Sequence, residues 1–210
     1  MGMTCNKVTF NMTQIILASS SPSRLRLLES AGIRPIVKVS GVDEESEEFA
    51  SLSPKELVSR LAILKAHAVK NDASGPSLII GCDSTFEFNG KSLGKPLTRE
   101  FAILRSRELS GKIGYLHTGH CLIDTKSGKE EHRVSTAQVE FALISEEEIL
   151  DYIDSGEPLN VAGGFTLDGL SAPFIKRIEG DPSGIIGLSL PLLREMVISL
   201  GYSWLDIKNT

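Results

Sequence analysis

The sequence predicts a mixed α/β fold with two lobes, and two features of its hydrophobic pattern carry that prediction. Over the first half of the chain, apolar stretches of strand length alternate with amphipathic stretches of helix length. The middle instead holds two strand-like stretches in direct succession, at 115–124 and 133–143. Strands that alternate with helices are typical of a parallel sheet, and strands in direct succession are typical of an antiparallel pair. A chain with both patterns indicates a mixed sheet.

The first elements follow the alternating pattern. Residues 14–18 (QIILA) predict a short buried strand, and a helix follows with Ser21 as its N-cap and Pro22 in its first position. Gly32 ends this helix, and the alternating residues 36–40 predict the next strand.

The second helix has a clear start signal. Ser53 and Glu56 have the spacing of a capping box, and apolar residues at helical spacing continue to about Asn71. An acidic loop at 43–53 leads into this helix, and a second buried strand is predicted at 77–82.

The second half of the chain begins with a hairpin over 86–94, in which Asn89-Gly90 supplies the turn. The remaining elements are predicted from periodicity and from glycine stop signals. They are helices at 98–109 and 145–156, a strand at 173–178, and a last helix toward the end of 184–201.

Composition indicates an ordinary soluble globular protein. The 210 residues are 41% hydrophobic and 23% charged, and no linker divides them, so we expect one domain over 14–210 after a loose N-terminal extension at 1–13. The net charge of −5 gives no general affinity for nucleic acid, and no apolar run is long enough to span a membrane. The three cysteines form no CxxC pair, and a cytoplasmic location is expected.

The corner between the first strand and the first helix, LASSSPSR at 17–24, is the first candidate site. A helix N-terminus offers unpaired N–H groups to phosphate, Ser19 and Ser21 add hydroxyl donors, and Arg24 adds a fork of N–H donors. Simple N-capping explains one serine equally well, so this stretch alone leaves both interpretations open.

Four more residues are candidates, each with an ordinary alternative. Asp83 directly follows the strand at 77–82, where α/β sheets hold ligands, although an Asp also starts turns. Glu44 lies in an acidic loop, Lys65 flanks an apolar helix face, and Lys95 follows a glycine; such residues are often simply solvated. Together they could make a site for Mg²⁺ and phosphate, because Mg²⁺ prefers oxygen ligands and substrate phosphates.

Taken together, these stretches resemble one family. LASSSPSRLRLLESAGI, VDE, IIGCDS, GKPLT, GEPLNVAGGFTLDG and IEGDPSGIIGLSLPLL occur in the order found in Maf proteins, and the similarity extends over roughly residues 14 to 200. The resemblance implies a mixed sheet with flanking helices and two lobes around a central cleft, the ITPase-like anvil, and it implies a homodimer.

The resemblance also implies a nucleoside triphosphate pyrophosphatase that needs a divalent metal cation, Mg²⁺ or Mn²⁺, and clears non-standard nucleotides. By position, Asp83 matches the proposed catalytic base, and Glu44 matches the acidic residue that helps hold the metal or its water, so both are expected at the metal site. The residues that match phosphate-binding positions, with Ser21 beside them, are Ser19, Arg24, Lys65 and Lys95.

Three departures from the common family pattern bear on the base of the nucleotide. Ser23 replaces an arginine, Ser84 a threonine and Asp168 a glutamine, at positions that set base preference in the family. A carboxylate only accepts hydrogen bonds, and guanine offers two adjacent donors, whereas uracil and thymine flank one donor with two acceptors. We therefore predict a guanine-type preference, as in the subgroup acting on 7-methyl-GTP, unless Asp168 merely makes a turn.

Two other functions fit part of the pattern. A non-catalytic inhibitor of cell division that binds nucleotide or a protein partner agrees with the older description of the family as septum formation inhibitors. It would not need Asp83, Glu44, Lys65 and Lys95 together. A hydrolase of different regiochemistry would release phosphate rather than pyrophosphate.

Overall fold

The computed structural model describes residues 13–208, so all but the last residue of the expected N-terminal extension lies outside the described residues. Its strands form one mixed sheet in the order β2-β1-β3-β5-β6-β7, with β4 paired to β3. Both β1–β2 and β1–β3 are parallel, and the other pairs are antiparallel. The strands are β1 (Gln14–Leu17), β2 (Ile36–Val37), β3 (Ser77–Phe88), β4 (Lys91–Leu93), β5 (Ile113–Asp124), β6 (Glu130–Phe141) and β7 (Ile175–Glu179).

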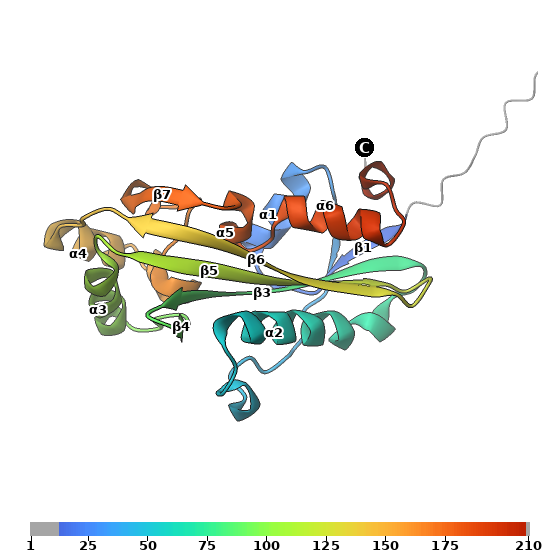
Figure 1. The fold of residues 1–210 in the computed structure, drawn as a ribbon, viewed down its shortest axis with the longest axis horizontal. Coiled ribbons are helices and arrows are strands. Elements are labelled where there is room, and N and C mark those ends of the chain that lie inside the picture. The colour runs from blue at the N-terminus through green and yellow to red at the C-terminus, as the bar shows by residue number, and fades with distance from the viewer. Residues whose placement is uncertain (1–12, 209–210) are drawn as a thin grey trace, which may run out of the picture.

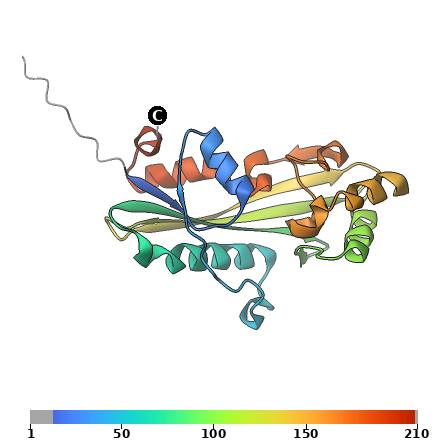
Figure 2. The ribbon, with the colours of Figure 1, turned by 180° about the vertical axis from the view of Figure 1, so that it is seen from behind.

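Helices flank the sheet on both faces, as predicted. Figure 1 shows α2 along one face and α1 and α6 along the other, and the view from behind in Figure 2 agrees. The α-helices are α1 (Pro22–Ser30), α2 (Pro54–Ala68), α3 (Arg99–Leu109), α4 (Glu146–Asp154), α5 (Pro182–Ile186) and α6 (Leu190–Ser199). Within residues 13–208, no helix has the length and apolar character needed to cross a membrane.

The apolar core divides into two lobes, which confirms the predicted architecture. At one end of the sheet, Leu28 and Leu193 pack on one face and Ile79 packs under α2 on the other. At the opposite end, Phe86 and Phe165 meet edge to face with their ring centroids 5.1 Å apart. Long strands run between the two ends, so one sheet carries both lobes (Figure 1).

Helix α2 lies unusually close to the sheet because two glycines face it. A Cβ atom on Gly81 would lie 2.2 Å from the carbonyl oxygen of Ala62, and one on Gly119 would lie 2.1 Å from that of Val58. No side chain fits in either space, so the helix backbone rests directly on β3 and β5. This contact fixes where the side chains of α2 reach the sheet.

Several predicted boundaries are wrong, each for a local reason. The strand expected at 36–40 is only two residues long, and the strand expected to end at Cys82 continues to Phe88 because residues beyond it pair with β5. The last apolar stretch is divided at Gly187, whose φ of +128° ends α5. The strand expected at 173–178 begins at Ile175, after a short 3₁₀ turn.

Candidate active site

A cavity of about 440 Å³ lies between the two lobes, on one edge of β3. Strand β1 pairs with β3 only as far as Ile80, and β4 pairs with β3 only from Phe86 onward. Between these points, no strand among the described residues covers that edge of β3. All ten residues singled out from the sequence line this cavity: Ser19, Ser21, Ser23, Arg24, Glu44, Lys65, Asp83, Ser84, Lys95 and Asp168.

Asp83 lies inside β3 rather than after it, which corrects the expectation from the sequence. It pairs with Gly119 of β5 and is 7% exposed. What ends near Asp83 is the neighbouring strand β1, at Leu17, so Asp83 still lies near the carboxyl end of a parallel strand. Since Gly81 and Asp83 are two residues apart, both point toward α2.

Lys65 of α2 connects the two candidate carboxylates. Its Nζ atom lies 2.6 Å from Oδ1 of Asp83 and 2.6 Å from Oε1 of Glu44. The lysine side chain is only 6% exposed, so it points into the protein and does not extend to solvent. Glu44 is 48% exposed and reaches the pair from the loop before α2.

Burial and charge shift the two carboxyl groups in opposite directions. Burial raises the pKa of Asp83, and the nearby charges of Lys65 and Arg24 only partly oppose this effect. Burial also acts to raise the pKa of Glu44, but its hydrogen bond with Lys65 and the charges of Lys65, Lys95 and Arg24 together outweigh burial, so its pKa is lowered. Asp83 is therefore the better proton acceptor, and Glu44 is the more firmly ionised of the two.

Arg24 is a buried arginine that connects three parts of the chain. Its Nε atom donates to the carbonyl oxygen of Gly187 at 2.8 Å, Nη1 donates to Oγ of Ser19 at 3.0 Å, and Nη2 donates to Oγ of Ser84 at 3.1 Å. Ser21 caps α1 by accepting from the backbone N–H of Arg24 at 3.5 Å. The serine-rich corner thus combines N-capping with a fixed guanidinium at the cavity wall.

Lys95 enters the cavity from the loop between β4 and α3, and other residues hold this loop in place. Arg105 of α3 donates to the carbonyl oxygen of Gly94. Leu97 has a left-handed backbone, with φ of +64°, and its N–H donates to the carbonyl oxygen of Leu159 at 3.1 Å. This conformation is unfavourable for leucine, so the contacts with the second lobe hold it in place.

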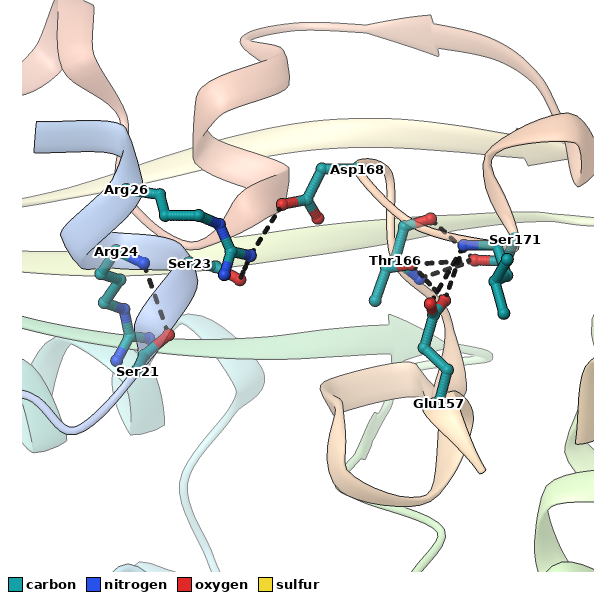
Figure 3. A network of polar contacts seen from close by, with 9 residues as sticks. Ser21, Ser23, Arg24, Arg26, Glu157, Thr166, Asp168 and Ser171 are labelled. Atoms are coloured by element: carbon teal, nitrogen blue, oxygen red, sulfur yellow. Dashed lines mark hydrogen bonds and ion pairs between the residues drawn. The ribbon is translucent and has the colours of Figure 1, made fainter. Parts of the chain in front are cut away.

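Ser23 and Asp168 also line the cavity, and Figure 3 shows Arg26 reaching toward both of them. Arg26, which was not singled out from the sequence, donates from Nη2 to Oγ of Ser23 at 2.9 Å and pairs with Oδ2 of Asp168 at 3.3 Å. Glu157 was also missed, although it lies in the GEP segment of a quoted motif, and it holds the loop that carries Asp168. Ser84, in contrast, accepts a hydrogen bond from Arg24.

The carboxylates of the cavity suit a divalent cation only if a bound substrate supplies further oxygen ligands. Among residues 13–208, no group of three or more His, Cys, Asp or Glu side chains is placed to hold a metal ion. Asp83 and Glu44 nevertheless approach a common point, since both contact the same Nζ atom. Mg²⁺ commonly binds one or two carboxylates and completes its coordination with water and phosphate oxygens.

The fold and cavity define a mixed α/β protein with two buried cations, Arg24 and Lys65, and a buried carboxylate, Asp83, in a cleft between two lobes. The model of the Maf-like protein family matches residues 14–200, and the chain belongs to this family.

Two similar proteins are both named nucleoside triphosphate pyrophosphatase. A nucleoside triphosphate pyrophosphatase of Salinispora tropica is 48% identical over 191 residues, which cover 89% of this chain and 84% of that protein. One of Thermosynechococcus vestitus is 46% identical over 198 residues, covering 94% and 99%. A solved nucleoside-triphosphatase, a dITP/XTP pyrophosphatase of Mycobacterium abscessus, shares 13% identity at a TM-score of 0.37 over 73% of this chain and 90% of that one, a likeness too slight to support an argument.

Proposed function

We propose that this chain is a nucleoside triphosphate pyrophosphatase, which converts a nucleoside triphosphate into a nucleoside monophosphate and pyrophosphate. The observation that carries this proposal is the contact of Lys65 with both Asp83 and Glu44 at the cavity wall. It joins a buried carboxyl group of raised pKa to a cation, in a cavity that also holds Arg24 and Lys95. The names of the similar proteins support the same activity.

The cations and the helix N-terminus bind the triphosphate in this proposal. Arg24 cannot turn away from the cavity, because three protein oxygens hold its guanidinium. Lys95 approaches from the opposite lobe, and the start of α1 presents N–H groups to anions. Phosphoryl transfer depends mostly on such positioning and charge neutralisation, so fixed cations on two walls suit it.

Asp83 acts as the general base in this proposal. Its carboxylate accepts a proton from a water molecule whose oxygen bonds to the α-phosphorus, while the bond from that phosphorus to the bridging oxygen breaks and pyrophosphate leaves. An ordinary Asp is a weak base, but burial raises the pKa of Asp83 toward the pH at which it would work. Lys65 orients the carboxylate through Oδ1.

We further propose that Glu44 and Asp83 hold a divalent metal cation, Mg²⁺ or Mn²⁺, when a nucleotide is bound. When bound, such an ion neutralises charge on the phosphate oxygens and on the leaving group. The lowered pKa of Glu44 keeps it ionised, as a metal ligand must be. Lys65 prevents the two carboxylates from repelling each other in the free protein.

A guanine-type base is the proposed preference, within a role in clearing non-standard or modified nucleotides. Asp168 lines the cavity together with Ser23, and its Oδ1 atom has no bonded partner among residues 13–208. An acceptor there suits the N1–H and amino donors of guanine and opposes the carbonyl oxygens of uracil and thymine. The homodimer and the cytoplasmic location also remain proposals.

An activity panel tests the proposal. Standard and modified nucleoside triphosphates are incubated with Mg²⁺ or Mn²⁺, and the products are identified as pyrophosphate or phosphate. We expect pyrophosphate, and a loss of about 10²- to 10⁴-fold in kcat for Asp83→Asn, the range for removal of a general base. Release of phosphate would indicate different regiochemistry. Absence of turnover with every nucleotide, despite nucleotide binding, would favour a non-catalytic regulator.

A further inference from the structure

Arg26 connects two segments that line the cavity, the start of α1 and the loop that carries Asp168. It extends from α1 in the first lobe, and its single Nη2 atom donates to Ser23 on the same helix and to Asp168 on the facing loop (Figure 3). Ser23 and Asp168 both line the cavity, whereas Arg26 does not and is 61% exposed. Any influence of Arg26 on a bound base therefore acts through these two residues.

The loop that carries Asp168 is fixed independently of Arg26. Glu157 accepts a hydrogen bond from Oγ1 of Thr166 at 2.6 Å and from the N–H of Leu170 at 3.0 Å. A Cβ atom on Gly169 would lie 2.5 Å from Oε2 of Glu157, so glycine lets this carboxylate approach the loop without moving aside. Removal of Arg26 would therefore change the charge and side-chain orientation of Asp168 and leave the loop backbone in place.

We propose that Arg26 is a positioning residue that sets base preference by neutralising Asp168 and directing its Oδ1 atom toward the base. This inference rests on the proposed function, in which Asp168 meets the base. An unpaired carboxylate attracts a cationic base such as 7-methylguanine more strongly than neutral guanine. Paired with Arg26, its negative charge is partly offset, so the native site attracts the cationic base less strongly than an unpaired carboxylate would, and Arg26 shifts the preference toward neutral guanine.

The test compares GTP with 7-methyl-GTP in the wild-type chain and in Arg26→Gln. We expect the ratio of kcat/KM for 7-methyl-GTP to that for GTP to rise about two- to fivefold, the range of a partly exposed ion pair. In an Asp168→Asn background, Arg26→Gln should leave this ratio unchanged. Raising the salt concentration should shrink the difference between wild type and Arg26→Gln, because the charges are accessible to counterions.

Arg99→Gln is the matched control. Arg99 also pairs with an exposed carboxylate, that of Asp154, at 2.8 Å, but it does not line the cavity. This variant should leave the ratio at its wild-type value, so a purely structural effect of losing an exposed pair is separated from an effect on the base.

The outcomes separate this inference from the function on which it rests. An unchanged ratio in Arg26→Gln, while Asp168→Asn does alter base preference, overturns the role of Arg26 and leaves the base-reading role of Asp168 intact. An equal rise with and without Asp168 also overturns it, since Arg26 would then act on the base directly. Failure of the wild-type chain to release pyrophosphate from either nucleotide overturns the guanine-type preference, and failure with every nucleotide of the activity panel overturns the proposed function itself.

Discussion

Lys65→Met tests whether the lysine at the centre of the site stabilises a buried charge. The substitution keeps the length of the side chain and removes the ammonium group that contacts Asp83 and Glu44, each at 2.6 Å. Asp83 would keep its buried position with only 10% of its side chain exposed and no cation in contact. Glu44 would lose a partner as well, but with 48% of its side chain exposed it can be solvated.

The two lost contacts contribute different amounts to the free energy of unfolding. Breaking a buried ion pair by removing one partner lowers the free energy of unfolding by about 3–5 kcal/mol, because an uncompensated charge stays buried. The half-exposed contact with Glu44 adds only about 0.2–1 kcal/mol. We therefore expect Lys65→Met to lose about 3–5 kcal/mol at pH 8, nearly all of it through Asp83.

The loss should depend on pH in one direction. The pKa of Asp83 already lies above its ordinary value of 3.8, mainly because of burial, and removal of the lysine charge raises it further. The folded state then holds a proton that the unfolded state releases, so the free energy of unfolding falls as the pH rises from about 3.8 through the folded pKa. The deficit of Lys65→Met should accordingly be smaller at pH 4.5 than at pH 8.

Urea unfolding of the wild-type chain and the variant at these two pH values measures the effect. Asp83→Asn placed on Lys65→Met should restore most of the lost stability at pH 8, since the amide carries no charge. Lys55→Met, at an exposed position on the same helix, is the control and should change stability by less than about 0.5 kcal/mol. A deficit of equal size at both pH values, or no rescue by Asp83→Asn, would refute the reasoning.

Two more substitutions test how the fold holds the site. Gly119→Ala should lower the free energy of unfolding in urea by about 1–3 kcal/mol, because the new Cβ would lie 2.1 Å from the Val58 carbonyl oxygen. Gly75→Ala is the control and should be nearly neutral, because Gly75 has open space around it. Glu157→Ala should cost about 1–3 kcal/mol by leaving hydrogen-bond donors of the Asp168 loop without an acceptor, and an equal loss in exposed Glu29→Ala would contradict this account.

Much of the fold could be predicted because its signals are local. Ser53 and Glu56 form the predicted capping box, and Asn89-Gly90 makes the predicted turn between β3 and β4. The extent of β3 could not be predicted, because residues beyond Cys82 join the strand only through their pairing with β5, a contact between distant parts of the sequence. Local pattern carries no information on such pairing.

The candidate site, like the fold, could be predicted only in part. Asp83, Lys65 and Glu44 were each identified singly and converge at one cavity, but the lysine that bridges the two carboxylates follows from the close approach of α2 at Gly81 and Gly119. Arg26 could not be found from its surroundings in the sequence, since its partner Asp168 is 142 positions away. Their roles in catalysis and base recognition remain predictions.

The strands that carry the active-site cleft also limit how it can move. Leu78 and Phe86 belong to the cores of opposite lobes and lie on the same strand, β3, and Leu122 and Leu116 do the same on β5. Within residues 13–208, these two strands run through both lobes, so a rigid-body swing of one lobe against the other would have to bend the shared sheet. We therefore expect any enclosure of a substrate to involve the segments around Glu44 and Lys95, and selectivity to depend on the shape of the cleft more than on large-scale closure.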